Sequence, residues 1–168
     1  VLFRSAGEDS FFIRFQALLE NNQTIEAETL LKKASHLSEA KRLQAKAYIG
    51  LVKGENGAVS EFFKDSEKLN SARSFLDVSR LALLQGLGPI AYEAFQLAWK
   101  IDRERFNLSQ ANQFLQISLS SRNTQEAHQI TGEILRRFPE KFGNANNHCY
   151  LSLLLGEEVD RKSTRLNS

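Results

Sequence analysis

Several residue types are scarce in this sequence, which has no methionine, one cysteine, one tryptophan and two prolines. The single cysteine, Cys149, cannot form an internal disulfide, and this excludes a small domain held together by disulfides. The longest apolar runs, such as LALL at 81–84 and LSLLL at 151–155, are much shorter than the ~20 residues that span a bilayer. Because proline interrupts helices, its scarcity also favours a helical chain.

Closely spaced metal-ligand patterns are missing as well. The three histidines, His36, His128 and His148, form no H-x-x-x-H pair, and no C-x-x-C occurs, although metal sites usually draw on such pairs. His148 and Cys149 are adjacent, which leaves metal or redox chemistry open as a hypothesis. Adjacent residues on a helix point in different directions, so we interpret both as packed helix residues. We expect no catalytic residue, no metal and no cofactor.

The remaining composition is that of a folded protein, with 42% hydrophobic and 25% charged residues in 168. No segment alternates apolar and polar residues at period two, so no strand is predicted. Apolar residues instead recur at helical spacing. The sequence predicts helices at 10–21, 24–35, 38–54, 58–69, 71–86, 88–101, 108–121, 123–138 and 144–156. Thr24, Gly88 with Pro89, and Asn123 with Glu126 are the expected helix starts.

These helices form pairs that repeat along the chain. A small or β-branched residue lies near the start of each second helix, at Ala27, Val59, Ala91 and Ala127, with spacings of 32, 32 and 36 residues. A leucine precedes each of them by eight residues, at Leu19, Leu51, Leu83 and Leu119. A unit of two helices cannot bury its apolar face alone, so neighbouring units are expected to stack.

The repeat resembles the tetratricopeptide repeat (TPR) family, over roughly residues 9–156. The motifs A-x-x-x-L-x-x-A at 27–34 and A-x-x-x-F-x-x-A at 91–98 match the second helix of that family, and Pro139 matches its closing proline. The first helices lack the tryptophan of the family. The resemblance implies an all-α fold, a right-handed α-solenoid of about four and a half stacked hairpins. Other solenoids of helical hairpins fit the same spacing.

The resemblance also implies a binding surface. In the family, ligand-facing positions lie on the first helices and line a concave face. The positions that match them in this sequence are mostly polar, and Tyr48, Arg73 and Arg80 are the expected anchors because Tyr and Arg often dominate interfaces. The predicted protein-binding residues are Lys41, Gln44, Tyr48, Arg73, Arg80, Asn112 and Gln116.

The two ends of the chain, VLFRS at 1–5 and DRKSTRLNS at 160–168, do not resemble parts of a protein. Codons for VLFRS can be the reverse complement of codons for DRKST, and this DNA resembles a sequencing-library adapter. We therefore expect a repeat domain at 6–159, truncated at both ends. Without the four basic residues and one acidic residue of these tails, 18 basic and 19 acidic residues remain. The basic charge of the whole chain therefore does not indicate nucleic-acid binding.

The sequence predicts a non-enzymatic helical repeat scaffold that binds a protein or peptide, as a fragment of a longer bacterial protein. We expect no nucleic-acid partner, no membrane contact and no small-molecule substrate. The alternative is a regulatory or substrate-positioning arm of an enzyme, such as a transferase, whose catalytic domain lies outside this fragment.

Overall fold

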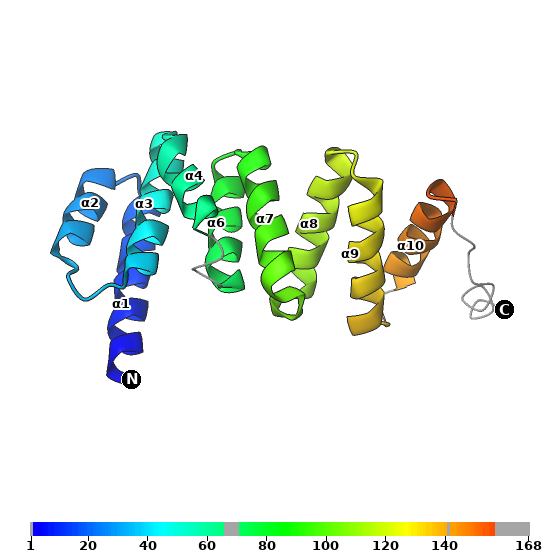
Figure 1. Ribbon diagram of the computed structural model, residues 1–168, viewed down its shortest axis with the longest axis horizontal. Helices are drawn as coiled ribbons and strands as arrows, with labels where there is room; N and C mark the ends of the chain where they lie inside the picture. The colour runs from blue at the N-terminus through cyan, green and yellow to red at the C-terminus, as the bar shows by residue number, and fades with distance from the viewer. Residues whose placement is uncertain (1, 66–70, 141, 157–168) are drawn as a thin grey trace. The chain divides into compact units, whose positions relative to one another are not determined.

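The computed structural model describes residues 2–65, 71–140 and 142–156. Nine α-helices and one short 3-10 helix lie in these residues (Figure 1), and the same residues contain no strand. The all-helical prediction is therefore confirmed for the part of the chain that is described. The chain divides into two compact units, residues 1–103 and 104–168, which are described separately.

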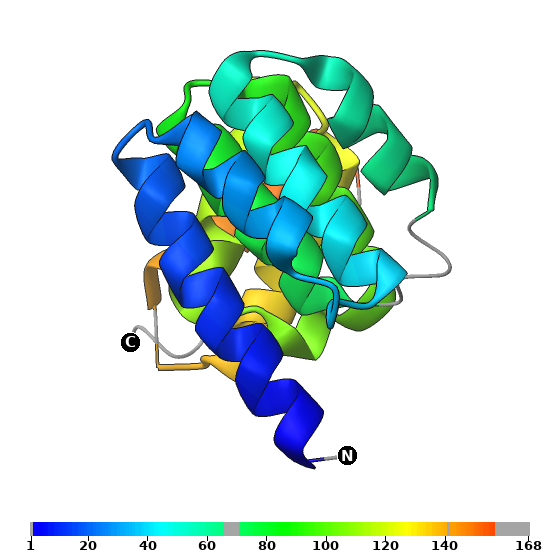
Figure 2. The same cartoon turned by 90° about the vertical axis from the view of Figure 1, so that its left-hand side faces the viewer.

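The first unit contains three helical hairpins. They are α1 (Leu2–Glu20) with α2 (Thr24–Lys33), α3 (Glu39–Lys53) with α4 (Asn56–Lys64), and α6 (Ala72–Leu84) with α7 (Gly88–Asp102). Helix α3 packs against its partner α4 and also against α1, α2 and α6. Figure 2 shows α1, α2 and α3 side by side within this unit. The first helices of successive hairpins therefore contact one another.

The second unit begins within the 3-10 helix η1 (Arg103–Arg105). It continues with α8 (Leu108–Ser120), α9 (Thr124–Arg137) and α10 (Phe142–Leu154). Helix α9 packs against both α8 and α10. The helices of both units agree with the predicted ranges to within a few residues, except that α1 begins earlier and α4 ends earlier than expected.

Local side-chain chemistry explains where these helices begin. Asn107 forms a reciprocal capping box with Gln110 at the start of α8, an arrangement that satisfies two backbone donors of the first turn. Asn123 caps α9 by accepting from the backbone N–H of Glu126, as predicted. The prediction that Thr24 caps α2 is wrong, because Thr24 is already helical and Gln23 occupies the cap position without a side-chain hydrogen bond.

The core is built from the aligned positions of the repeat. Ala27, Val59, Ala91 and Ala127 are all at most 2% exposed, so the second helix of each hairpin can lie close to its neighbour. The aligned leucines behave less uniformly. Leu19 and Leu51 are buried, but Leu83 is only half-buried and Leu119 is 44% exposed. Leu119 therefore lies outside the core, although it has the same position in the repeat as the buried Leu19 and Leu51.

Phenylalanine supplies most of the large buried side chains, which are Phe15, Phe62, Phe75, Phe95, Phe106 and Phe114. The rings of Phe62 and Phe75, on α4 and α6, lie 4.9 Å apart. In the second unit, the rings of Phe106 and Phe114 lie 6.1 Å apart. Such contacts add to the free energy of area burial. These six side chains therefore belong to the core.

Helix α1 includes residues 2–5, which were assigned to the N-terminal tail, so the structure marks no boundary at residue 6. The other predicted tail, 160–168, lies outside the described residues. Across the described ranges, none of the helices combines the length and the apolar character needed to cross a membrane.

Candidate functional site

Five of the seven residues predicted to bind a partner lie in the first unit, on two helices that pack together. Lys41, Gln44 and Tyr48 belong to α3, and Arg73 and Arg80 belong to α6. Their spacing along each helix places them on the side where α3 and α6 meet. The remaining two, Asn112 and Gln116, lie on α8 of the second unit, half-buried and exposed respectively.

A buried chain of hydrogen bonds joins α3 to α6. The side-chain amide of Gln44 donates from Nε2 to the Tyr48 hydroxyl at 2.7 Å. The Oε1 atom of the same amide accepts from Ser74 Oγ at 3.0 Å and from Lys41 Nζ at 3.1 Å. Ser74 Oγ also lies 3.0 Å from Ser71 Oγ. Gln44 is therefore the centre of a polar network that connects the two helices.

The burial of this network corrects one part of the prediction. Tyr48 is fully buried and Gln44 is 2% exposed, so the expectation that both face solvent is wrong. The physical reason is that α1 covers α3 here, where the Phe12 ring meets Tyr48 edge-on at 6.1 Å. Burial also raises the pKa of the Tyr48 phenol above its ordinary value, and the Asp77 carboxylate adds to this effect. Tyr48 therefore lies beneath the surface residues and does not reach a partner itself. Partner binding by this region stays a prediction.

The side chains that reach solvent beside this network are mainly basic. Arg73 and Arg80 are exposed, and Lys41 is half-buried with its ammonium group 5.1 Å from the centre of the Phe12 ring. Arg80 also forms an ion pair with Glu20 of α1 at 3.5 Å. Cation–π contacts and ion pairs of this kind hold long side chains in a preferred direction. We call Lys41, Arg73, Asp77 and Arg80 the α3–α6 charge cluster.

Asp77 is the acidic member of this cluster, and sequence reasoning missed it. Its burial raises the pKa of the carboxyl group, while Arg73, Arg80 and Lys41 act in the opposite direction. The signal was present in the sequence, because Asp77 lies four residues after Arg73 and three before Arg80, on one helix face. Ser74 was missed for another reason. Its role depends on Gln44, 30 residues away, and no local pattern reports that contact.

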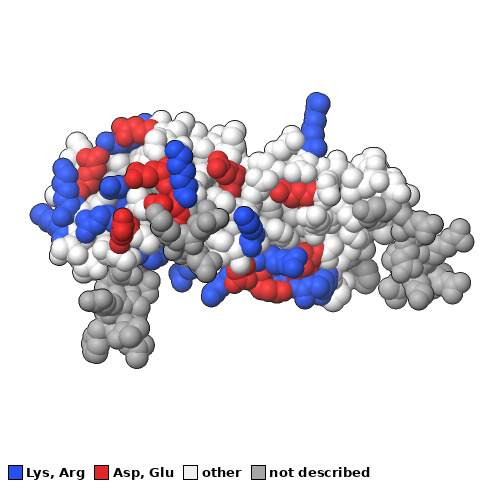
Figure 3. Space-filling view, viewed as in Figure 1, with Lys and Arg blue, Asp and Glu red and all other residues white. Residues whose placement is uncertain are grey.

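Acidic and basic side chains are interspersed on the part of the surface that the first unit forms in Figure 3. The face shown there carries no large area of one sign. Charge on this face therefore occurs in small mixed groups. The α3–α6 charge cluster is also mixed, with one carboxylate among three cations. Small mixed groups suit the recognition of a protein surface, whereas nucleic-acid binding normally uses an extended basic surface.

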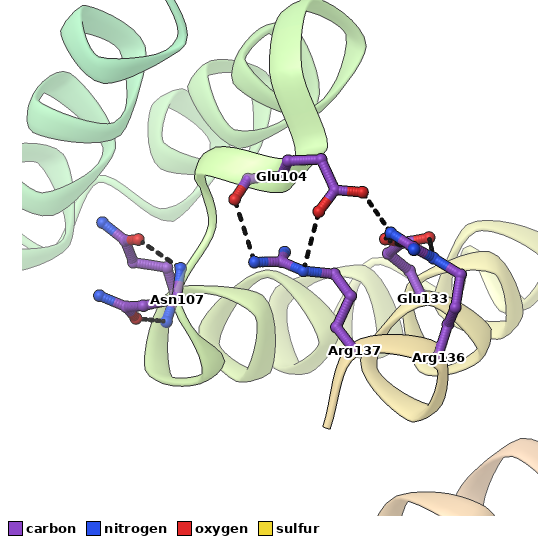
Figure 4. A network of polar contacts seen from close by, with 6 residues as sticks. Glu104, Asn107, Glu133, Arg136 and Arg137 are labelled. Carbon is purple, nitrogen blue, oxygen red and sulfur yellow. Dashed lines mark hydrogen bonds and ion pairs between the residues drawn. The ribbon is translucent and has the colours of Figure 1, made fainter. Parts of the chain in front are cut away.

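A second polar cluster lies in the second unit (Figure 4). Arg136 of α9 forms ion pairs with Glu133, at 2.5 Å, and with Glu104 of η1. The guanidinium of Arg137 contacts the same Glu104 twice. It lies 3.2 Å from the Glu104 carboxylate and donates to the Glu104 backbone carbonyl at 3.0 Å. The hydrogen bonds that Arg136 donates to Glu133 and Glu104 raise the pKa of its guanidinium. The cluster attaches the segment before α8 to the end of α9, which is a structural role.

The sequence left metal or redox chemistry open at His148 and Cys149, which are adjacent residues of α10. His128 of α9 and His148 of α10 stack with ring centres 4.2 Å apart. His128 Nε2 lies 2.7 Å from Ser152 Oγ, and His148 Nδ1 lies 3.0 Å from Thr131 Oγ1. In the ranges that the structure describes, no three His, Cys, Asp or Glu side chains are grouped so as to hold a metal ion. These contacts attach α10 to α9.

Comparison with known proteins adds no further information to these clusters. No protein-family model, curated protein or solved structure matches this chain. The TPR resemblance therefore remains a prediction from the sequence, and any functional conclusion depends on the geometry of the sites.

Proposed function

We propose that this chain is a non-catalytic, TPR-like segment of a helical scaffold that binds another protein. In this proposal its hairpins stack as a right-handed solenoid, and the partner contacts the exposed side chains around the α3–α6 charge cluster. The observation that carries the proposal is the buried Tyr48–Gln44–Ser74 network, which connects two successive first helices directly beneath exposed basic side chains.

The contacts within each unit support the repeat architecture. In the first unit α3 packs against the first helices before and after it as well as against both neighbouring second helices. Stacked hairpins require such contacts, because each hairpin buries its apolar face only against its neighbours. The residues aligned four after the small position, Leu31, Phe63, Phe95 and Thr131, are all buried. The same positions of the repeat therefore form the core in both units.

The polar network supports a binding role for the adjoining surface. Among the described residues, every buried side-chain nitrogen or oxygen has a hydrogen-bond partner, so the network does not depend on a ligand to be satisfied. A fully satisfied network is rigid and specifies one arrangement of its helices. Lys41 is part of this network, and Arg73 and Arg80 lie one turn on either side of Asp77. Prior ordering of these cations lowers the entropic cost of binding a partner.

The partner expected from this chemistry offers carboxylates or carbonyl groups to Lys41, Arg73 and Arg80. Arginine can form paired hydrogen bonds with a carboxylate, which gives direction as well as attraction. The half-buried Phe12 ring beside Lys41 adds an apolar contact. A mixed surface of this kind is typical of a protein–protein contact.

The experiment compares two double variants that remove the same charge from the first unit. The chain, carrying an affinity tag, is incubated with extract and its partners are identified by mass spectrometry. We expect Arg73→Ala/Arg80→Ala to lose a partner that Lys33→Ala/Lys100→Ala retains, since Lys33 and Lys100 are exposed on the second helices α2 and α7. Equal recovery by both double variants contradicts the assignment of this surface. Circular dichroism of each variant confirms that the helices are intact.

A further inference from the structure

A groove of about 340 Å³ lies in the first unit, on a different side of α3 from the charge cluster. Leu31 of α2, Ile49 of α3 and Ala58 of α4 line its floor. Arg42, Lys46 and Ile49 of α3 also line it, and they recur at intervals of four and three residues, so they share one helix face. Lys41, Gln44 and Tyr48 lie on another face. The groove is therefore a separate surface from the one in the proposed function.

Two small residues, Gly50 and Ala58, line the side of the groove that α3 and α4 form. Gly50 lies on the floor, and a Cβ atom there would come within 2.6 Å of the backbone oxygen of Glu55 and 3.4 Å of the Ala58 Cβ. The backbone turn that connects α3 to α4 therefore closes over position 50, where Glu55 N–H donates to the Gly50 carbonyl at 2.8 Å. Because Ala58 is also short, α4 leaves its side of the groove without a large side chain. The result is an apolar floor open to solvent.

The rim of the groove has an excess of positive charge. Lys32, Arg42 and Lys46 lie on it, together with Glu28 and Glu55. The ammonium of Lys53 lies 2.5 Å from the Glu28 carboxylate and 3.9 Å from that of Glu55, so one lysine contacts both acids. Arg42 uses one guanidinium nitrogen to donate to the Ala34 carbonyl at 3.0 Å. The lining itself carries three cations and two carboxylates, a net charge of +1, and Lys53 adds a fourth cation beside the two acids.

Lys46 is the cation best placed to meet a ligand. It is exposed on the rim, and within the described part of the chain it makes no hydrogen bond or ion pair. Its ammonium carries three donors. A ligand that brings a carboxylate to Lys46 therefore gains a charge-assisted contact without breaking an existing one.

We propose that this groove binds a short acidic segment of a partner protein, which inserts a leucine-sized apolar side chain between Leu31, Ile49 and Ala58. Carboxylates on either side of that side chain pair with Lys46, Lys32 and the remaining donors of Arg42. Charge complementarity is the reason for choosing an acidic segment. A peptide fits better than an acyl chain, because the open groove shelters one side chain but leaves a long hydrocarbon partly in water.

The probe is a fluorescein-labelled helical peptide with leucine at every third or fourth position and glutamate elsewhere. Two matched peptides replace glutamate with lysine, or leucine with serine. Fluorescence anisotropy with the complete chain measures binding. We expect only the glutamate–leucine peptide to bind, and we expect Lys46→Glu to weaken it by about tenfold. Lys100→Glu changes the net charge equally, away from the groove, and should have little effect.

Two further variants test whether the peptide occupies the groove itself. Ala58→Phe places an aromatic ring in the groove and should weaken the peptide about tenfold or more. Arg73→Ala/Arg80→Ala should leave its affinity unchanged, which distinguishes this proposal from the proposed function. The inference is overturned if no peptide binds, if the lysine–leucine peptide binds equally well, or if Lys46→Glu behaves like Lys100→Glu. Binding of laurate that Ala58→Phe abolishes, without peptide binding, would identify a fatty acid as the occupant and also overturn it.

Discussion

The buried Tyr48–Gln44 pair offers a quantitative test of how α3 and α6 are held together. Replacing Tyr48 with phenylalanine keeps the ring in its site and removes only the hydroxyl group that accepts from Gln44 Nε2 at 2.7 Å. The Gln44 amide then has a buried N–H group without that acceptor. Leaving a buried donor unsatisfied costs about 1–3 kcal/mol. We expect Tyr48→Phe to lower the free energy of unfolding by this amount.

A double-mutant cycle separates the hydrogen bond from other effects of the substitution. Gln44→Leu removes the amide but keeps an apolar side chain of similar length, and Ser74 retains its contact with Ser71 at 3.0 Å. In this background the Gln44 amide is absent and only the hydrogen bond of the half-buried Gln16 with the Tyr48 hydroxyl is lost, so we expect Tyr48→Phe to cost less than ~1 kcal/mol. The coupling energy between the two positions is therefore expected to be about 1–2 kcal/mol.

Urea denaturation measures both quantities. Far-UV circular dichroism follows all helices, and the fluorescence of Trp99, on α7, follows the first unit. Coincidence of the two transitions tests whether one free energy describes the unfolding. If Tyr48→Phe has the same effect in both backgrounds, within about 0.5 kcal/mol, then the hydrogen bond does not stabilise the α3–α6 contact.

Three further predictions concern stability. Burial raises the pKa of Asp77 above its ordinary 3.8, so ionisation of this carboxyl group opposes folding. Asp77→Asn should therefore stabilise the chain at pH 7. Urea midpoints should show that this gain in stability disappears as the pH falls through the pKa of folded Asp77 towards 3.8. Gly50→Ala places a Cβ atom 2.6 Å from the Glu55 backbone oxygen and should lower the free energy of unfolding by about 1–3 kcal/mol. Gly57→Ala, with nothing within 4 Å of its Cβ, should raise the free energy of unfolding by about 0.5–1 kcal/mol. Equal urea midpoints for the two variants would contradict the close contact at Gly50. Asn107→Ala removes the capping box of α8 and should cost about 0.5–2 kcal/mol, which thermal unfolding measures, and an unchanged melting temperature would show that the cap is not needed.

The helices could be predicted because their signals are local. Apolar spacing of three and four residues, with Pro89 at a helix start and Asn123 at a cap, marked the helices at nearly the correct residues. Ala91 and Ala127 were also predictable core positions, since the repeat places a small residue at the same step of each hairpin. Leu119 shares that alignment yet is exposed, because alignment reports a position in the repeat and not which neighbouring side chains are present to cover it.

The candidate site was predictable only in part. Lys41, Arg73 and Arg80 were found from their positions in the repeat, but the same rule placed Tyr48 on the surface. Exposure depends on which atoms of other helices lie above a side chain. For Tyr48 these include Phe12, 36 positions earlier in the sequence, and no pattern within α3 records that contact.

By itself the sequence determined that the described part of the chain is helical, where most of its helices begin and end, and which small residues lie at helix contacts. These properties depend on interactions between residues a few positions apart, which the spacing of hydrophobic residues and the capping residues indicate directly. Only the tertiary structure decided that Gln44 and Tyr48 are buried, that Ser74 joins them, and that residues of α2, α3 and α4 line a basic-rimmed groove. Each of these depends on distances between residues on different helices, and the spacing of hydrophobic residues along the sequence does not determine such distances.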